Sequence, residues 1–424
     1  MQPFDVIDGE LHAEGVPLSQ IAADAGTPTY VYSAASIKAQ YDALNGALKR
    51  ALPEGARQPL LCYACKANSN VAVLSYIRSL GGGLEVVSEG ELMRGLKAGF
   101  DPKKIVSTGV GKQDSEITAQ LEAGILQLNV ESIPELENIN RIAGEMGKQA
   151  EIVFRWNPNV SGGGHDKIST GRARDKFGIG ADRIEEAFAL AAQMDHIEAL
   201  GLSMHIGSQV FTVDSFKQAF ETLPDLVTKL RGAGYRIERL DIGGGFPIIY
   251  KDEKLLDLDA YARWVAEIVA PLDTQIILEP GRYLVGNAGI LLSKVVYVKK
   301  TDERDFLVLD AGMNDLIRPA MYDAYHGIEA VQQTNRPWQS YDVVGPVCET
   351  GDTFTRQREL PEIRPGELVV LQSAGAYGAS MASNYNTRRL PAEVFVHGQS
   401  YSIIRQRQSY QDILDQDIVP DWID

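Results

Sequence analysis

A regular alternation of short β-type runs and amphipathic helical stretches, between residues 36 and 283, most constrains the fold of this 424-residue chain. This pattern is typical of a parallel sheet whose strands are joined by helical crossovers. The runs of strand length are residues 60–65, 84–87, 104–107, 126–130, 151–156, 199–205, 238–242 and 275–279. Eight strands favour a closed (β/α)8 barrel over an open sheet, and we assign this barrel to residues 33–283.

One crossover carries a helix-start signal. In the stretch 132–146, Ser132 and Glu135 stand in the register of a capping box. Ile139, Ile142 and Met146 follow on one stripe of the expected helix. The sequence therefore predicts an amphipathic helix over this stretch, with its apolar face against the barrel.

After Val285 the pattern changes to alternating and β-branched runs that are separated by Gly, Pro and Asn turns. Residues 284–424 are therefore expected to form a second, mostly antiparallel β-domain. Residues 1–32 end in the extended run TPTYVYS and are expected to add a strand to it. The longest irregular stretch, residues 157–180, is glycine-rich and charged, which suits a mobile loop over the barrel mouth or an ordinary solvated loop.

Charge and cysteine content narrow the class of protein. The formal charge of -16 is spread along the chain, which argues against nucleic acid or an anionic membrane as a partner. The N-terminus lacks the apolar core of a signal peptide, and no stretch is long and uncharged enough to span a bilayer, so we expect a cytoplasmic protein. Cys62, Cys65 and Cys348 are too few for a disulfide framework, and strand periodicity places the first two on opposite faces. Reduced thiols and no metal site are expected.

Four clusters of chemically active residues follow four of the predicted strands. They are Lys66 in LLCYACKANSN, His205 in HIGSQ, Gly243 to Gly245 in DIGGGFP, and Glu279 in EPGRYLV. Strand ends of a parallel barrel open onto one face, so the four clusters are expected to share one cavity. An amine, an imidazole, a glycine turn and a carboxylate together indicate a pyridoxal phosphate site.

Each cluster has a role in such a site. Lys66 can hold the cofactor as an imine, although a paired structural lysine is the alternative for a charge at the end of an apolar strand. Gly243 to Gly245 can present backbone N–H groups to a phosphate, and the run does not match the dinucleotide or P-loop spacings. Glu279 can keep the pyridine nitrogen protonated. His205 can lie against the ring, with Ser208 as a phosphate ligand.

The motifs YACKANSN, HIGSQ, DIGGGFP, EPGRYLV, IRPAMY, GPVCETGD and AGAYGASMASNYN together resemble those of the fold-type III, alanine-racemase-like pyridoxal phosphate decarboxylases. The similarity runs in the expected order from about residue 25 to residue 410 and is greatest to the branch that acts on diaminopimelate. Two positions depart from the family pattern: Cys65 replaces the usual aliphatic residue, and Glu85 stands where an aspartate is often found.

The resemblance implies a role for each matching position. Lys66 would form the internal Schiff base, His205 would stack on the ring, and Glu279 would face the ring nitrogen. The glycine turn, Gly281 and the rest of the EPGR stretch would bind the phosphate. The residues implied around the substrate are Arg282, Arg318 and Tyr322 for its distal carboxylate, Glu349 for its distal ammonium, Tyr377 for cofactor and substrate together, and Cys348 for protonation of the α-carbon. In the family Cys348 and Glu349 would come from a neighbouring subunit, which implies a homodimer.

The choice of substrate depends on the distal residues. A tail with both a carboxylate and an ammonium would pair Arg282 and Arg318 with the first and Glu349 with the second, and meso-diaminopimelate has that tail. The expected reaction is its decarboxylation to L-lysine and carbon dioxide. Alternatives on the same scaffold are decarboxylation of ornithine, arginine, lysine or carboxynorspermidine, or a racemase, which Glu279 disfavours. A non-catalytic relative would have lost Lys66 or Cys348, and both are present.

Overall fold

The computed structural model describes residues 3–158, 160 and 176–423. The chain divides into two compact units, which are considered separately. The barrel unit comprises residues 38–248 and 254–284, and the β unit comprises the chain up to residue 37, residues 249–253 and the chain from residue 285 onward. Most of the stretch 157–180, for which a loop over the barrel mouth is predicted, lies outside the described residues.

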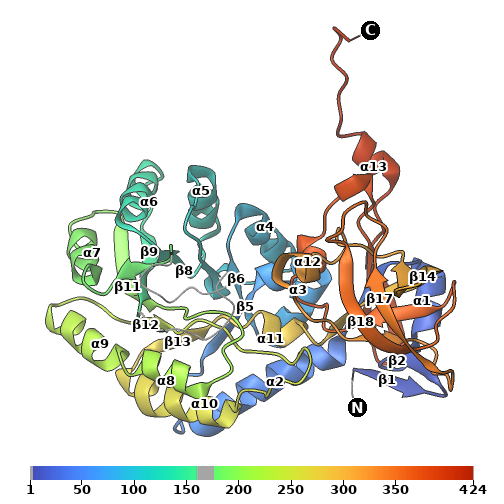
Figure 1. The fold of residues 1–424 in the computed structure, drawn as a ribbon. Coiled ribbons are helices and arrows are strands. Elements are labelled where there is room, and N and C mark those ends of the chain that lie inside the picture. Colours follow the sequence, from blue (N-terminus) through green and yellow to red (C-terminus); the bar gives the residue numbers. More distant parts are fainter. Residues whose placement is uncertain (1–2, 159, 161–175, 424) are drawn as a thin grey trace. The chain divides into compact units, whose positions relative to one another are not determined.

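The barrel unit is built on eight parallel strands that close into a ring (Figure 1). Neighbours in sequence pair in register, and the last strand pairs with the first. The strands are β5 (Leu60–Ala64), β6 (Gly83–Val86), β7 (Ile105–Ser107), β8 (Gln127–Val130), β9 (Ala150–Asn157), β11 (Ile197–Ser203), β12 (Arg239–Asp241) and β13 (Gln275–Leu278). A short extra strand, β10 (Ile179–Gly180), pairs with β9. The prediction of a closed eight-stranded barrel is confirmed.

Helices pack around the strands because each buries one apolar stripe. In α6 (Ile133–Glu145) that stripe includes Leu136, Ile139 and Ile142. The other barrel helices are α2 (Ala34–Ala51), which begins in the β unit, α3 (Val71–Ser79), α4 (Glu89–Lys97), α5 (Asp114–Ala123), α7 (Ile184–Ala191), α8 (Val213–Phe220), α9 (Leu223–Gly232) and α10 (Leu258–Trp264). None of the helices within the described residues has the length and apolar character that crossing a membrane would require.

The start of α6 differs in one detail from the predicted capping box. The Ser132 hydroxyl accepts the Glu135 N–H, as the sequence predicts. The Glu135 carboxylate, however, accepts the N–H of Glu131 and the ammonium of Lys112. One Glu135 oxygen is held by the charge-assisted bond from the buried Lys112 ammonium, and the other is engaged one residue before the N-cap. The carboxylate therefore joins α6 to the loop after β7.

An aromatic cluster supports the end of β12. Phe246 follows the glycine turn and packs against Tyr261 of α10, Phe216 of α8 and Tyr283, with ring centroids 4.9 to 5.9 Å apart. Phe216 and Phe220 also meet Tyr261 edge to face. This packing holds Phe246, and with it the adjoining glycine turn, in place.

The β unit contains one large mixed sheet, mostly antiparallel as predicted, in the order β18-β17-β15-β14-β4-β20-β21. Only β15–β17 and β4–β20 are parallel among its described pairs. Its strands are β4 (Thr29–Ser33), β14 (Gly289–Lys300), β15 (Asp305–Leu309), β16 (Ile328–Ala330), β17 (Trp338–Val344), β18 (Thr353–Pro361), β19 (Leu368–Leu371), β20 (Ala392–His397) and β21 (Ser400–Arg405). Smaller elements are β1 (Phe4–Ile7), β2 (Glu10–Ala13), β3 (Val16–Pro17), α1 (Leu18–Ala25), α12 (Arg318–Tyr322) and α13 (Tyr410–Leu414).

Candidate active site

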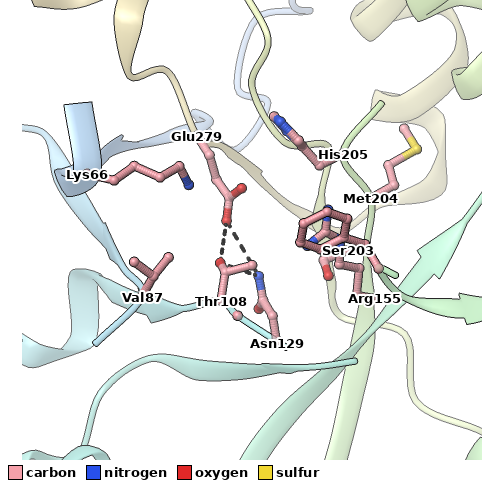
Figure 2. A pocket seen from close by; sticks show the side chains of 11 residues that line it. Lys66, Val87, Thr108, Asn129, Arg155, Ser203, Met204, His205 and Glu279 are labelled. Atoms are coloured by element: carbon pink, nitrogen blue, oxygen red, sulfur yellow. Dashed lines mark hydrogen bonds between the residues drawn. The ribbon is translucent and has the colours of Figure 1, made fainter. Parts of the chain in front are cut away.

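A cavity of about 210 Å³ opens at the carboxyl ends of the barrel strands. Figure 2 shows that its lining side chains come from strands all around the barrel and converge on one space. Three residues singled out from the sequence, Lys66, His205 and Glu279, line it together. The other lining residues are Val87, Thr108, Gly109, Asn129, Arg155, Phe177, Ser203 and Met204. The expectation of one shared cavity agrees with this geometry for these three clusters, whereas Gly243 to Gly245 are not among its lining residues.

Lys66 lies in a short turn, η1 (Cys65–Ala67), directly after β5. Its ammonium lies 2.9 and 3.1 Å from the two carboxylate oxygens of Glu85 on β6. The Glu85 side chain is fully buried, whereas that of Lys66 is 41% exposed. The lysine is therefore held by a buried acid and still reaches into the cavity, so the structural pairing and a chemical role coexist at this residue.

His205 follows β11, and its ring is oriented by the backbone of the glycine turn. The Gly244 N–H donates to Nδ1 of His205 at 3.1 Å, so a neutral ring carries its hydrogen on Nε2. Burial lowers the pKa of His205 well below its usual range, and the charges of Arg155 and Lys66 act in the same direction. The ring is therefore neutral at pH 7 and can pack against an aromatic face without carrying charge.

Packing around the turn after β12 leaves no room for side chains at Gly243 and Gly244. A Cβ on Gly243 would lie 2.4 Å from the Met204 carbonyl oxygen, and one on Gly244 would lie 2.1 Å from that of Glu279. The turn exposes fewer N–H groups than its sequence predicts, because Gly243 donates to Asp241 and Gly244 donates to His205. The expectation of three N–H groups turned outward is therefore corrected for the first two.

Ser208, Gly281 and Arg282 lie near this turn in the barrel unit. The Arg282 guanidinium donates to the Ser208 hydroxyl at 3.2 Å, which joins the loop after β11 to α11 (Arg282–Val285) after β13. Gly281 leaves no room for a side chain, since a Cβ there would lie 2.9 Å from that of Ala64. These contacts bring an arginine and a hydroxyl together, which is a donor set suited to an anion.

Glu279 directly follows β13 and enters a hydrogen-bond network inside the barrel (Figure 2). Its carboxyl accepts hydrogen bonds from the Thr108 hydroxyl at 3.1 Å and from the Asn129 amide at 3.5 Å. Burial raises the pKa of Glu279 well above its usual range, and the Asp241 and Glu85 carboxyls add to this, against the opposing effect of Lys66. A cation brought beside Glu279, such as a protonated ring nitrogen, would relieve this unfavourable burial.

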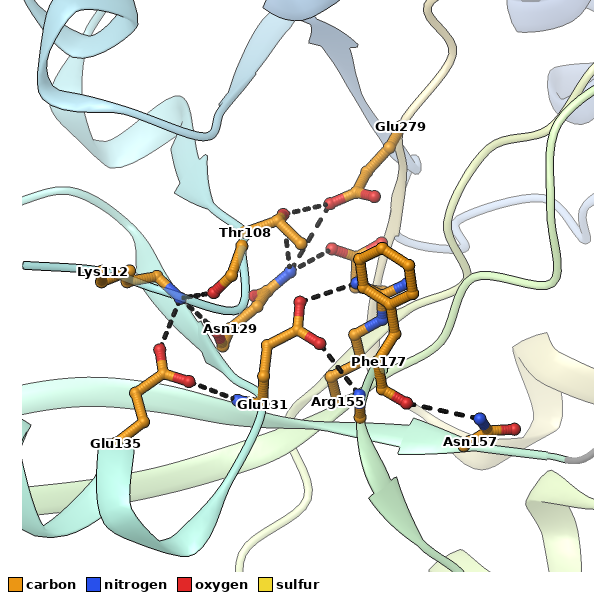
Figure 3. Close-up of polar contacts among 12 residues, drawn as sticks. Thr108, Lys112, Asn129, Glu131, Glu135, Arg155, Asn157, Phe177 and Glu279 are labelled. Carbon is orange, nitrogen blue, oxygen red and sulfur yellow. Dashed lines mark hydrogen bonds and ion pairs between the residues drawn. The ribbon is translucent and has the colours of Figure 1, made fainter. Parts of the chain in front are cut away.

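Arg155 also lines the cavity, and its guanidinium lies 4.7 Å from the centroid of the Phe177 ring. It also makes a buried ion pair with Glu131 at 2.7 Å. The second Glu131 oxygen accepts the Gly178 N–H at 2.9 Å, so this acid joins β9 to the segment that follows residue 175 (Figure 3). These contacts hold an aromatic side chain and a cation at the cavity edge.

The β unit carries the remaining residues predicted for the site. Arg318 begins α12, is buried, and donates to Nε2 of His326 at 2.9 Å. The other ring nitrogen of His326 lies 2.8 Å from the Gln372 carbonyl oxygen, and the Arg318 guanidinium lies 4.6 Å from the centroid of the Tyr250 ring. The guanidinium is thereby held in one orientation by a histidine and an aromatic ring.

The other predicted residues of this unit lie in loops or at a helix end. Cys348 and Glu349 are exposed in the turn between β17 and β18, and Glu349 accepts the Tyr385 hydroxyl at 2.9 Å. Tyr322 ends α12. Tyr377 is half-buried with φ of +56°, a conformation that costs a bulky residue energy and is concentrated at functional sites.

Several residues had no role predicted from the sequence: Thr108, Asn129, Arg155 and Asp241 at the barrel cavity or its hydrogen-bond network, and Tyr250 and His326 around Arg318 in the β unit. Asp241 begins the motif DIGGGFP and Thr108 directly follows the predicted strand 104–107, and their place at strand ends was a usable signal. Nothing in the local pattern marked His326 or Tyr250. The described residues contain no group of three or more His, Cys, Asp or Glu side chains arranged to hold a metal ion.

Fold and cavity together define a barrel enzyme of the pyridoxal-dependent decarboxylase class. Residues 35–286 match the family model described as pyridoxal-dependent decarboxylase, pyridoxal binding domain. The chain belongs to the diaminopimelate decarboxylase family, because its full-length relatives carry that name. The diaminopimelate decarboxylase of Pseudomonas aeruginosa is 46% identical over 97% of this chain and 98% of the relative. That of Zymomonas mobilis is 41% identical over 100% of both chains.

Solved structures agree with this assignment. The diaminopimelate decarboxylase of M. jannaschii in complex with L-lysine superposes with a TM-score of 0.93, at 38% identity, over 98% of both chains. The enzyme of Helicobacter pylori, also with L-lysine, gives a TM-score of 0.89 at 38% identity over 94% of this chain and 98% of that one. Both comparisons cover the barrel unit and the β unit.

Proposed function

We propose that this protein converts meso-2,6-diaminopimelate to L-lysine and carbon dioxide with pyridoxal 5'-phosphate as cofactor, the last step of lysine biosynthesis. The observation that carries the proposal is the presence of Lys66 and Glu279 on one cavity of a family member. An amine and a buried acid on the same barrel mouth are what a pyridoxal ring needs at its two ends.

The residues fit the cofactor. Lys66 supplies the amine for its aldehyde, and Glu279 supplies an acid for its ring nitrogen. Ser208, Gly245, Gly281 and Arg282 offer hydroxyl, backbone and guanidinium donors for its phosphate. When bound, the cofactor supplies a protonated ring that accepts the electron pair released by loss of carbon dioxide.

The chain's own residues have separate tasks around that ring. Neutral His205 packs against its face and excludes water from it. Glu279 would hold a negative charge beside the ring nitrogen and so would favour its protonated form. Cys348 delivers the proton to the α-carbon of the product. The last assignment rests on family position and on the exposed thiol.

Recognition of the substrate's distal end would fall to Arg282, Arg318, Tyr322, Tyr377 and Glu349. A guanidinium presents a planar fork that matches a carboxylate, and His326 holds the fork of Arg318 in place. Glu349 is a suitable partner for the distal ammonium. This pairing favours a substrate with both groups over ornithine, arginine, lysine or carboxynorspermidine, which lack the distal carboxylate or the same arrangement of groups.

Arg318→Ala is expected to raise KM for diaminopimelate about 10- to 100-fold while kcat changes little, because one charge-assisted contact to the substrate is worth about 1.5 to 3 kcal/mol. Steady-state kinetics measure both constants. Arg304→Ala is the matched control, since Arg304 pairs with Asp342 in the same unit and should leave KM unchanged. An unchanged KM in Arg318→Ala would remove Arg318 from substrate recognition.

A competition experiment tests the reaction. Meso-diaminopimelate, lysine, ornithine and arginine are offered together while carbon dioxide and the products are followed. Loss of diaminopimelate with stoichiometric L-lysine is expected. Consumption of ornithine, arginine or lysine in preference would instead assign the chain to another decarboxylase on this scaffold.

We propose further that the enzyme works in the cytoplasm as a homodimer whose subunits exchange Cys348 and Glu349. Both residues are exposed on their own subunit, and this supports the proposal. A catalytic thiol would face solvent there unless a second subunit covered it. Mixing inactive Lys66→Ala with inactive Cys348→Ala chains is expected to restore about a quarter of wild-type activity through mixed dimers. No recovery after verified subunit exchange would place all site residues in one chain.

A further inference from the structure

Asp241 lies at the end of β12 in the barrel interior, where the proposed reaction gives it no task. Its side chain is only 2% exposed. One carboxylate oxygen accepts the Gly243 N–H at 3.0 Å, and the other accepts the Asn129 amide at 3.2 Å. The same amide nitrogen lies 3.5 Å from a Glu279 carboxyl oxygen, so one donor serves both acids. Figure 3 shows the Asn129 amide beside Glu279 and Thr108.

Two buried carboxyl groups that share one donor nitrogen cannot both be ionised without a large electrostatic cost, since a buried pair of like charges is screened weakly. One proton on the pair removes this repulsion whenever no cation lies beside the two acids.

We propose that Asp241 is a positioning residue for Glu279: the two carboxyls share one proton and, with the Asn129 amide, fix the Glu279 carboxyl in the orientation that would meet the ring nitrogen. This inference rests on the proposed function. Asp241 also joins the two ends of the cofactor site. Its carboxylate holds the Gly243 N–H, and the Gly243 carbonyl oxygen accepts the Glu279 N–H at 2.8 Å.

The surroundings of the pair agree with a shared proton. The titratable and charged groups that act on it are Glu85 from β6, Lys66 after β5, Cys62 from β5 and Tyr261 from α10. Burial raises the pKa of Asp241 to about 6 against the hydrogen bonds from Gly243 and Asn129, and it raises the pKa of Glu279 well above its usual range. Lys66 is the one cation among these named neighbours, and Glu85 already binds it.

The first test uses the full chain after removal of the cofactor. Both acids have raised pKa values in the folded chain, so the stability they contribute is complete below their unfolded pKa and is lost as pH rises through the folded values. The contribution of the pair to the melting temperature is expected to fall as the pH rises above about 4 and through the raised pKa of Asp241, about 6, and Asp241→Asn is expected to remove a large part of that fall. Asn129→Ala removes a hydrogen-bond donor that stabilises the ionised acids, so it is expected to enlarge the fall in melting temperature with rising pH.

The second test uses the cofactor-loaded chain. Asp241→Asn is expected to lower kcat about tenfold, to leave KM within about twofold, and to shift the pH profile of kcat, because the charge behind Glu279 is gone. Asp342→Asn, a buried aspartate on β17, is the control and should keep the wild-type profile.

The outcomes separate the two proposals. A wild-type chain that shows no cofactor absorbance would remove the proposed function. A wild-type chain that binds cofactor, together with an Asp241→Asn chain that keeps the wild-type pH dependence of both melting temperature and kcat, would overturn the role of Asp241. Because Asn129→Ala shifts the pH dependence of the melting temperature in the opposite direction, misfolding of a single variant leaves the inference testable.

Discussion

Lys66→Ala is expected to lower kcat by about a thousandfold or more and to abolish the absorbance of covalently held cofactor. The amine is the one group that can bond the cofactor's aldehyde, and loss of a covalent catalyst is among the largest single-residue effects known in enzymes. Turnover assays and the absorbance spectrum of the purified chain measure the two effects.

Lys66→Arg separates this chemical role from the structural one. Arginine keeps a positive charge for the buried Glu85 carboxylate, but its guanidinium stays protonated and cannot bond an aldehyde. The chain should therefore fold with near wild-type stability and remain inactive. Substantial turnover by Lys66→Arg would mean that Lys66 serves only as the partner of Glu85.

Glu279→Ala is expected to lower kcat about 100-fold with a much smaller effect on cofactor affinity. Without the acid, the ring nitrogen loses the charge that keeps it protonated. A 100-fold fall in kcat corresponds to an increase of about 2.7 kcal/mol in the activation free energy. The phosphate donors and Lys66 are untouched, so the cofactor should still bind. Single-turnover kinetics and cofactor titration measure the two quantities.

Two further variants make the Glu279 result interpretable. Glu279→Gln keeps an oxygen for the Thr108 hydroxyl but removes the charge, and it should be nearly as slow as Glu279→Ala. Glu267→Ala, at an exposed acid of the same unit, should be as active as wild type. A fast Glu279→Gln enzyme would show that hydrogen bonding, and not charge, is what this residue provides.

Much of the barrel could be predicted because its signals are local. Each strand is a short apolar run, and each helix carries its own stripe, as α6 does with Leu136, Ile139 and Ile142. Placement of Lys66, His205 and Glu279 on one cavity then followed from topology, since parallel strands end on one face. The resemblance to known decarboxylases added specific roles to positions that topology had already brought together.

The parts that could not be predicted depend on pairing between distant residues. Asn129 reaches both Asp241 and Glu279, which lie more than a hundred positions further along the chain. His326 orients Arg318 through a contact whose geometry is set by the loops of the β unit. Periodicity shows which face a residue occupies, but it does not show which side chain it meets across a closed barrel.

The glycine turn and Glu85 illustrate the same limit. The sequence indicated N–H groups turned outward at Gly243 and Gly244, yet two side chains from strand ends accept them. Glu85 departs from the family's usual aspartate and still forms the ion pair with Lys66. Side-chain length decides such contacts, and a pattern of polar and apolar residues does not record it.

The most direct measurement of the central claim is a crystal structure of the chain with pyridoxal phosphate bound. We expect continuous density between the Lys66 amine and the cofactor, with a Glu279 carboxylate oxygen about 3 Å or less from the ring nitrogen. A cofactor bound elsewhere, or a ring nitrogen facing a residue other than Glu279, would contradict it.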